Sequence, residues 1–316
     1  MIYHNNKEII DWKFDANQIN KIYYNENVIF GKIDVIPPQD YSVQYLTFLI
    51  QSSGTISFVG SDKTNRISYS TDSGNTWSTE SNNVTVNVNS GDMVLWKGEM
   101  IPQGYAVGVG KFSGTSNYEV QGNIMSMEYG DNFINQTNFN SNTGYDFFQL
   151  FSGNNITNAE NLILPATSLT ESCYNQLFSN CTSLTTAPQL PSTILDTSCY
   201  SHMFDGCTSL TTAPQLPSTT LAQNCYSSMF DGCTSLTQAP QLPATTLVNA
   251  CYYRMFYGCS NLNYIKMLAT DISASSCLGN WVNDVASTGT FVKHPSMTSL
   301  PSGVSGIPNG WTVEDA

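Results

Sequence analysis

Two consecutive stretches decide the fold: CYSHMFDGCTSLTTAPQLPSTTLAQN at residues 199–224 and CYSSMFDGCTSLTQAPQLPATTLVNA at residues 225–250. They align without a gap, so the sequence repeats with a period of 26 residues. Similar sequences occur at residues 173–198 and, with more substitutions, at residues 251–276. A fixed period of this size indicates structural units that stack on their neighbours, rather than the core of a globular enzyme.

The cysteines follow the same period. All nine belong to two series, Cys173, Cys199, Cys225, Cys251 and Cys277, then Cys181, Cys207, Cys233 and Cys259. We expect each to stack on its counterpart as a small, buried, free thiol. Stacked units lie ~4.8 Å apart, so disulfides between them remain an alternative. The C-x7-C spacing does not fit zinc and no histidine recurs with it, so we expect no metal.

Each repeat contains signals for one helix and one strand. Cys199–Phe204 places apolar residues four apart and predicts a short helix, which Gly206 ends. Leu210–Ala213 predicts a short strand, and Pro214 and Pro217 force an extended path after it. The expected unit is therefore one helical turn and one strand.

These residues resemble a known family. Phe204, Cys207 and Leu210, followed by Leu216 and Pro217, are similar to the BspA-like, Treponema-type leucine-rich repeats. The resemblance covers about residues 146–277 and implies a leucine-rich-repeat solenoid. The known settings of this family are bacterial surface adhesins and phage proteins of gut Bacteroidales.

Residues 1–36 contain a short internal repeat, in which apolar segments flank an Asn-centred turn. This pattern is typical of β-hairpins. A module this short buries little surface by itself, so we expect it to dock on its own trimer mates or on another protein. The candidate docking residues are Ile2, Tyr3, Ile22 and Tyr23. Val35–Pro38 is the expected linker.

Residues 37–129 predict a β-sandwich, because short apolar segments alternate with turn residues. The expected strands are Val43–Ile50, Thr55–Val59, Arg66–Ser70, Val84–Val88, Met93–Lys97, Tyr105–Val109 and Tyr118–Val120. The repeat domain is expected at 130–277, with an N-terminal cap at about 130–153. Residues 278–316 no longer repeat and are expected to form a C-terminal cap. The expected fold class is thus mostly β with short helices.

Composition excludes several classes of function. The chain has 11 Lys and Arg and 24 Asp and Glu, which gives a net charge of −13. We therefore expect no basic surface for binding nucleic acid. No window of about 18 apolar residues predicts a membrane span. The sequence after Met1 does not resemble an export signal, so we expect a protein that is made in the cytoplasm and not exported.

No motif points to catalysis. Ser70–Trp77 matches the Asp-box, S-x-D-x-G-x-T-W, in which Asp72 would accept backbone N–H groups and Gly74 would take a positive φ. The box is known from sialidases, where it lies away from the catalytic pocket, and we interpret it here as a structural hairpin. His4, His202 and His294 share no neighbourhood, so no triad is indicated. We expect no catalytic residues and no cofactor.

The remaining candidate is a binding surface on the repeats. Polar residues beside the expected strands form columns, Thr185/Thr211/Thr237, Thr186/Thr212/Gln238 and Gln189/Gln215/Gln241. Such columns either stabilise the ladder or hydrogen-bond sugar hydroxyls. A second candidate patch is Tyr253, Arg254 and Tyr257, which either recognises a ligand or packs on the C-terminal cap.

The whole arrangement, ending in Gly306–Val313, is similar to fibre-like proteins of Bacteroides phages and prophages. This resemblance implies a non-enzymatic virion appendage, most simply a trimer, bound to other virion proteins through its N-terminus and attaching to a host-surface glycan or protein. One alternative is a bacterial cell-surface adhesin of the same repeat family. A remote alternative is an Asp-box glycosidase.

Overall fold

The computed structural model describes residues 39–60, 66–80, 83–99, 109–141 and 143–316 in full, and the backbone of 3–4, 7–8, 11–15, 18–24 and 27–30. The chain divides into two compact units, Met1–Asp40 and Tyr41–Ala316. The protein is mostly β, with 27% strand and 4% helix, as predicted. Within the described part of the chain, no helix is long and apolar enough to cross a membrane.

The N-terminal unit consists of antiparallel strands. β1 (Tyr3–His4) pairs with β2 (Lys7–Glu8), and β4 (Gln18–Tyr24) lies between β3 (Asp11–Asp15) and β5 (Asn27–Phe30). These strands match the hairpins predicted for residues 1–36. Of the predicted docking residues, Tyr3 lies on β1 and Ile22 and Tyr23 lie on β4, with only their backbone described. Ile2 and the linker Val35–Pro38 lie outside the described residues.

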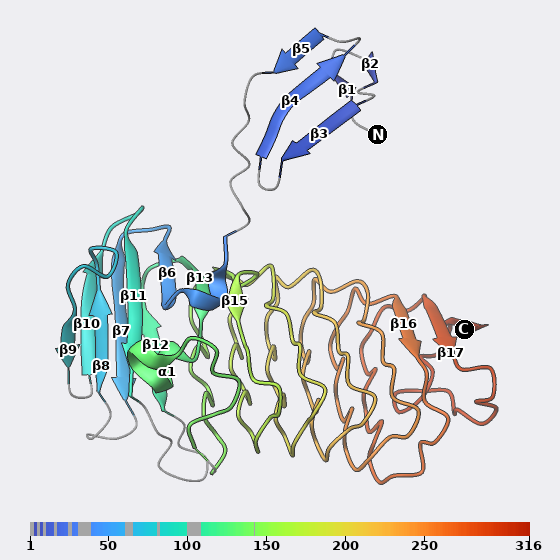
Figure 1. Ribbon diagram of the computed structural model, residues 1–316. Helices are drawn as coiled ribbons and strands as arrows, with labels where there is room; N and C mark the ends of the chain where they lie inside the picture. Colours follow the sequence, from blue (N-terminus) through green and yellow to red (C-terminus); the bar gives the residue numbers. More distant parts are fainter. Residues whose placement is uncertain are drawn as a thin grey trace. The chain divides into compact units, whose positions relative to one another are not determined.

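The second unit begins with two sheets that pack face to face (Figure 1). The smaller sheet has the order β10 (Asn83–Val88), β7 (Gly54–Gly60), β12 (Gly110–Gly114). The larger sheet has the order β14 (Ile156–Asn158), β13 (Tyr118–Asn123), β6 (Leu46–Ile50), β11 (Met93–Gly98), β8 (Ile67–Ser70), β9 (Ser78–Glu80), with β15 (Leu162–Ile163) also beside β13. Phe112 of the smaller sheet touches Phe48 and Trp96 of the larger one, with ring centroids 4.8 and 5.0 Å apart. These buried rings form the core of the sandwich.

Sequence patterns found most of these strands and missed β9, β12, β14 and β15. β9 is fully exposed Ser-Thr-Glu, so it shows no apolar alternation, and β12 has Phe112 as its one large apolar residue. The segment predicted as Val43–Ile50 begins as the short helix η1 (Tyr41–Val43), and β6 starts only at Leu46. The predicted strand Tyr105–Val109 lies outside the described residues except for Val109.

The 26-residue repeats form coils that stack on one another (Figure 1). The N–H of Tyr174 donates to the carbonyl of Cys199 in the next coil at 3.0 Å, and Tyr200 does the same to Cys225 at 3.0 Å. The degenerate first repeat already has this geometry, since the N–H of Phe147 donates to the carbonyl of Cys173 at 2.8 Å. The stack therefore begins inside the segment that was predicted as an N-terminal cap.

The predicted helix at Cys199–Phe204 is absent, and the segment is a series of tight turns. The N–H of Met203 donates to the carbonyl of Tyr200 at 3.2 Å, whereas the N–H of His202 donates to Ser227 of the next coil at 2.8 Å. Because alternate N–H groups leave the coil, the i→i−4 bonds of an α-helix cannot form.

The turn segment depends on left-handed backbone at every fourth residue. Ser198, His202 and Gly206 have φ values of 55°, 53° and 72°. The four-residue spacing still directs Cys199, Tyr200, Met203 and Phe204 inward, and all four are buried. The four-residue spacing of the apolar side chains thus gives two buried rows, although the helix predicted from that spacing is absent.

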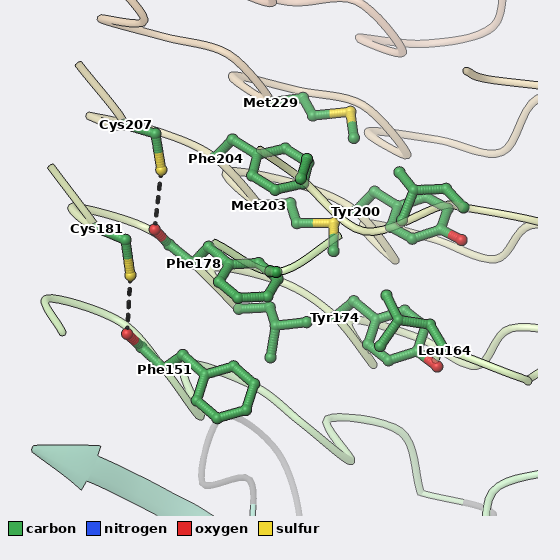
Figure 2. Packing of buried hydrophobic residues seen from close by; sticks show 14 of the residues in the cluster. Phe151, Leu164, Tyr174, Phe178, Cys181, Tyr200, Met203, Phe204, Cys207 and Met229 are labelled. Atoms are coloured by element: carbon green, nitrogen blue, oxygen red, sulfur yellow. Dashed lines mark hydrogen bonds between the residues drawn. The ribbon is translucent and has the colours of Figure 1, made fainter. Parts of the chain in front are cut away.

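Columns of identical side chains fill the stack (Figure 2). The rings of Tyr174 and Tyr200 stack with centroids 5.8 Å apart, and those of Phe178 and Phe204 stack 5.7 Å apart. The Cys207 thiol donates to the carbonyl of Phe178 at 3.1 Å. All nine cysteines are free and buried, as the sequence predicted.

The opposite side of the coils carries isolated parallel bridges, so the strand predicted at Leu210–Ala213 is reduced to the bridge at Thr212. Thr186 bridges Thr212, and the last coils widen into the parallel sheet β16 (Tyr264–Met267), β17 (Thr290–Lys293), β18 (Thr312–Asp315). The N–H of Phe256 donates to the carbonyl of Trp281 at 2.8 Å, so the turn segment also continues past Cys277. Residues 278–316, expected to be a non-repeating cap, thus extend the stack without repeating its sequence.

The sandwich and the stack share β-structure. β13 pairs antiparallel with β6 of the sandwich and parallel with β14 and β15 of the first coil. Beyond β13, the short helix α1 (Ser126–Tyr129) and the 3-10 helix η2 (Gly130–Asn132) lead toward the stack. The two predicted domains are therefore parts of one compact unit.

Candidate functional site

The predicted polar columns lie on the exposed side of the ladder. Thr185 donates its hydroxyl to the carbonyl of Thr157 at 2.9 Å, and Thr211 donates to Thr185 at 3.5 Å. The hydroxyls of Thr185 and Thr211 thus join neighbouring coils, in line with the ladder-stabilising interpretation. Thr212 and Gln238 of the neighbouring column are exposed, and Thr186 is half-buried.

The glutamine column behaves differently. Gln189, Gln215 and Gln241 are all exposed, each on its own coil. Within the described part of the chain, none of their side-chain amides has a hydrogen-bond partner, so each keeps its donors and its acceptor. Because the three glutamines occupy the same position in successive 26-residue coils, they form a row along the stack. This row is the candidate site.

The patch of Tyr253, Arg254 and Tyr257 lies in the turn segment, not on the ladder. Arg254 pairs with Asp231 through Nε at 3.0 Å and Nη2 at 2.9 Å, and its guanidinium lies 3.9 Å from the ring centre of Tyr257. A Cβ on Gly279 would meet the ring of Tyr253 at 2.7 Å, so that ring packs on the next coil. The structure therefore supports the packing interpretation for Tyr253 and gives Arg254 internal partners.

His202 also lies in the turn segment. Its side chain is half-exposed, and its Nδ1 is 3.0 Å from Oδ2 of Asp205. The Nδ1 of His294 instead accepts from the backbone N–H of Ser296 at 3.2 Å. The side chain of His4 is outside the described residues.

The Asp-box forms the hairpin that its sequence predicted. Asp72 accepts from the backbone N–H and the hydroxyl of Thr76 at 2.9 and 2.6 Å, and Gly74 has a φ of 86°. These hydrogen bonds lower the pKa of Asp72 to about 2. Its carboxylate is occupied by the turn. Trp77 packs edge-on against Tyr45, with ring centroids 4.9 Å apart.

Sequence reasoning missed a buried carboxyl pair between α1 and the first coil. Glu128 accepts from the N–H of Asn140 at 2.9 Å, and Asp146 accepts from Ser141 and Thr170, both at 2.8 Å. Burial, reinforced by the neighbouring Asp146, raises the pKa of Glu128 well above its usual range, and burial also raises the pKa of Asp146. Asp146 replaces a repeat cysteine, which was the one signal in the sequence. Both side chains are buried, so the pair is not accessible to a substrate.

A second missed feature is a shallow hollow of about 190 Å³ in the sandwich. Its lining residues are Arg66, Ser68, Thr79, Lys97, Gly98, Glu99, Gly130 and Asp131. They lie on β8, β9, β11 and η2 or, for Arg66 and Glu99, directly beside β8 and β11, and no short motif links them. Across the described residues, no group of three or more His, Cys, Asp or Glu is placed to hold a metal.

Comparisons with protein-family models, with curated proteins and with solved structures found no match to this chain.

Proposed function

We propose that the stack is a leucine-rich-repeat solenoid of the BspA-like kind and that the protein is a non-enzymatic, fibre-like virion appendage. In this proposal the N-terminal unit docks on other virion proteins, and the stack attaches to a glycan on the host surface. The observation that carries it is the row of exposed, unpartnered amides at Gln189, Gln215 and Gln241.

The chemistry of the row fits a polyhydroxylated ligand. Each amide offers two N–H donors and a carbonyl acceptor, and a sugar hydroxyl both donates and accepts. The amides carry no charge, so they do not select an anionic or cationic partner. Repetition along the stack would let one glycan chain contact several coils, so that weak contacts combine through effective concentration.

The stack is a rigid support for such a row. Stacked rings and thiols fill its interior, and backbone hydrogen bonds join each coil to the next. Gln189, Gln215 and Gln241 lie in extended segments between these joined coils, so the backbone that carries the amides is already ordered before a ligand binds.

The N-terminal unit supports the docking part of the proposal. Sheets this short bury little surface by themselves, and residues 1–40 form a compact unit of their own, which suits a module that folds against a partner. Ile2, Tyr3, Ile22 and Tyr23 remain the proposed contact residues, and a trimer is the proposed assembly. Mass measurement of the full chain tests the trimer, and a stable monomer would contradict it.

The binding test uses the full chain on an array of neutral and acidic glycans and on gut Bacteroidales cells. We expect replacement of all three glutamines, Gln189→Ala, Gln215→Ala and Gln241→Ala, to reduce binding at least about 10-fold. Gln223→Ala is the matched control, because Gln223 is also an exposed glutamine of the repeats. Undiminished binding by the triple variant would remove the row from the proposal.

The virion location needs its own test, because a cell-surface adhesin of the same repeat type would use the same row. Co-sedimentation of the protein with phage particles supports the appendage. If the protein is instead labelled on the surface of intact bacterial cells and is absent from the particle fraction, the adhesin replaces the virion appendage as the proposed function. The Asp-box glycosidase is not proposed, because the hairpin turn occupies the Asp72 carboxylate.

A further inference from the structure

The hollow in the sandwich has walls from four elements. The β8–β9 hairpin supplies Ser68 and Thr79, whose hydroxyls lie 2.8 Å apart. β11 supplies Lys97, and Asp131 comes from η2. The Asp-box turn closes this same hairpin, so its hydrogen bonds fix one wall of the hollow.

Lys97, the strand partner of Ser68, and Asp131 are both held in place. The ammonium of Lys97 lies 2.6 Å from Asp131 and 4.1 Å from the ring centre of Trp77. Tyr45 donates its hydroxyl to the same Asp131 oxygen at 2.7 Å. Ion pair, cation–π contact and hydrogen bond together restrict both side chains before any ligand arrives.

Arg66 and Glu99 complete the hollow with unused side chains. Their backbones are joined, since the N–H of Glu99 donates to the carbonyl of Arg66 at 3.3 Å. Both side chains are exposed, and neither forms a hydrogen bond or ion pair within the described part of the chain. The guanidinium has donors only, and the carboxylate has acceptors only.

The lining charges cancel, because two cations, Arg66 and Lys97, face two anions, Glu99 and Asp131. A neutral hollow does not attract an ion, and its separate donors and acceptors require a ligand that offers both. Its volume of about 190 Å³ is below the ~300 Å³ of sites for drug-sized molecules and leaves room for one small ring.

We propose that this hollow binds a single neutral sugar ring, with Arg66 donating to ring hydroxyls and Glu99 accepting from them. Lys97, Ser68 and Thr79 supply the remaining polar contacts. This site is on the sandwich, so it goes beyond the glutamine row and does not depend on it.

Saturation-transfer NMR on the full chain tests the proposal, with methyl glucoside, methyl galactoside and methyl mannoside as neutral probes and methyl glucuronide as the acidic probe. We expect transfer to at least one neutral pyranoside with millimolar affinity. Arg66→Ala and Glu99→Gln should each weaken it at least about 10-fold, since hydrogen bonds to charged groups are among the stronger ones. Lys111→Ala is the matched control, because Lys111 is an exposed cation on β12 of the other sheet.

Transfer to none of the neutral probes, or to the glucuronide alone, overturns the proposal. So does transfer that neither Arg66→Ala nor Glu99→Gln weakens. Melting curves check that each variant is folded. If Arg66→Ala does not fold, Glu99→Gln alone decides the question, because glutamine keeps the shape of the glutamate side chain. The triple glutamine variant should leave this signal unchanged, which separates the hollow from the row on the repeats.

Discussion

At the scale of single residues, Glu128 makes stability depend on pH. The groups that face it are Asp146, Tyr129 and Tyr174, together with the N–H of Asn140. Burial raises its pKa above the unfolded value of 4.5, so the folded state binds the extra proton. The stability this proton provides is complete below pH 4.5 and decreases as pH rises through the folded-state pKa.

We therefore expect Glu128→Gln to raise the melting temperature at pH 7 and to change it little at pH 4. The amide keeps the shape and hydrogen bonds of the protonated carboxyl without the cost of burying a charge. Melting curves from pH 4 to 8 measure this, with Glu160→Gln as the control at an exposed glutamate. A lower melting temperature of Glu128→Gln at pH 7 would contradict the prediction.

The thiols give a second residue-scale prediction. Burial raises their pKa values, to about 12 for Cys181 and Cys251, and thiolates are the reactive form. We expect Ellman's reagent to react slowly with the native protein at pH 8 and with nine thiols after denaturation. Cys277, at 4% exposure against 0% for the other eight, should react first. Fewer than nine thiols in denaturant would reveal disulfides.

At the scale of elements, the left-handed residues distinguish turns from a helix. Ser228 is buried in the turn segment with a φ of 52°. We expect Ser228→Gly to be more stable than Ser228→Ala by about 1 kcal/mol, because a Cβ disfavours left-handed backbone. Inside an α-helix the order is reversed by a similar amount. Denaturant unfolding of the two variants measures the difference, and the reversed order would restore the helix that the sequence predicted.

The repeated sequence predicted which residues are buried but not the path of the backbone between them. A four-residue spacing of Cys199, Tyr200, Met203 and Phe204 is shared by a helix and by the observed turns. The choice between them depends on the third residue after each first cysteine taking a left-handed φ, as Ser228 does at 52°, and serine does not signal that conformation. β17 and β18 were missed for another reason. The coils continue beyond the residues whose sequence repeats, so no repeat signal marks these two strands.

At the scale of the whole molecule, the candidate sites differ in how far the sequence could find them. The glutamine row was predictable, because Gln189, Gln215 and Gln241 recur with the period. The hollow was not, because tertiary folding alone brings Arg66 and Asp131 together.

The unit Tyr41–Ala316 should unfold as one body, because its two parts share β13 and a continuous core. Phe151 joins them, with its ring centroid 5.8 Å from that of Phe112 in the sandwich and 5.4 Å from that of Phe178 in the stack.

We expect Phe151→Ala to cost about 3–5 kcal/mol and to lower the unfolding midpoint of both parts equally. The measurement is fluorine NMR of the protein labelled with 5-fluorotryptophan, in which Trp96 reports on the sandwich and Trp281 on the stack. Both tryptophans are fully buried. Phe230→Ala, whose ring stacks on Phe204 and Phe256 within the repeats, is the matched control and should also shift both signals together. If the Trp96 and Trp281 signals change at separate denaturant concentrations in the unmodified chain, the sandwich and the stack are independent, and the shared strand does not couple them.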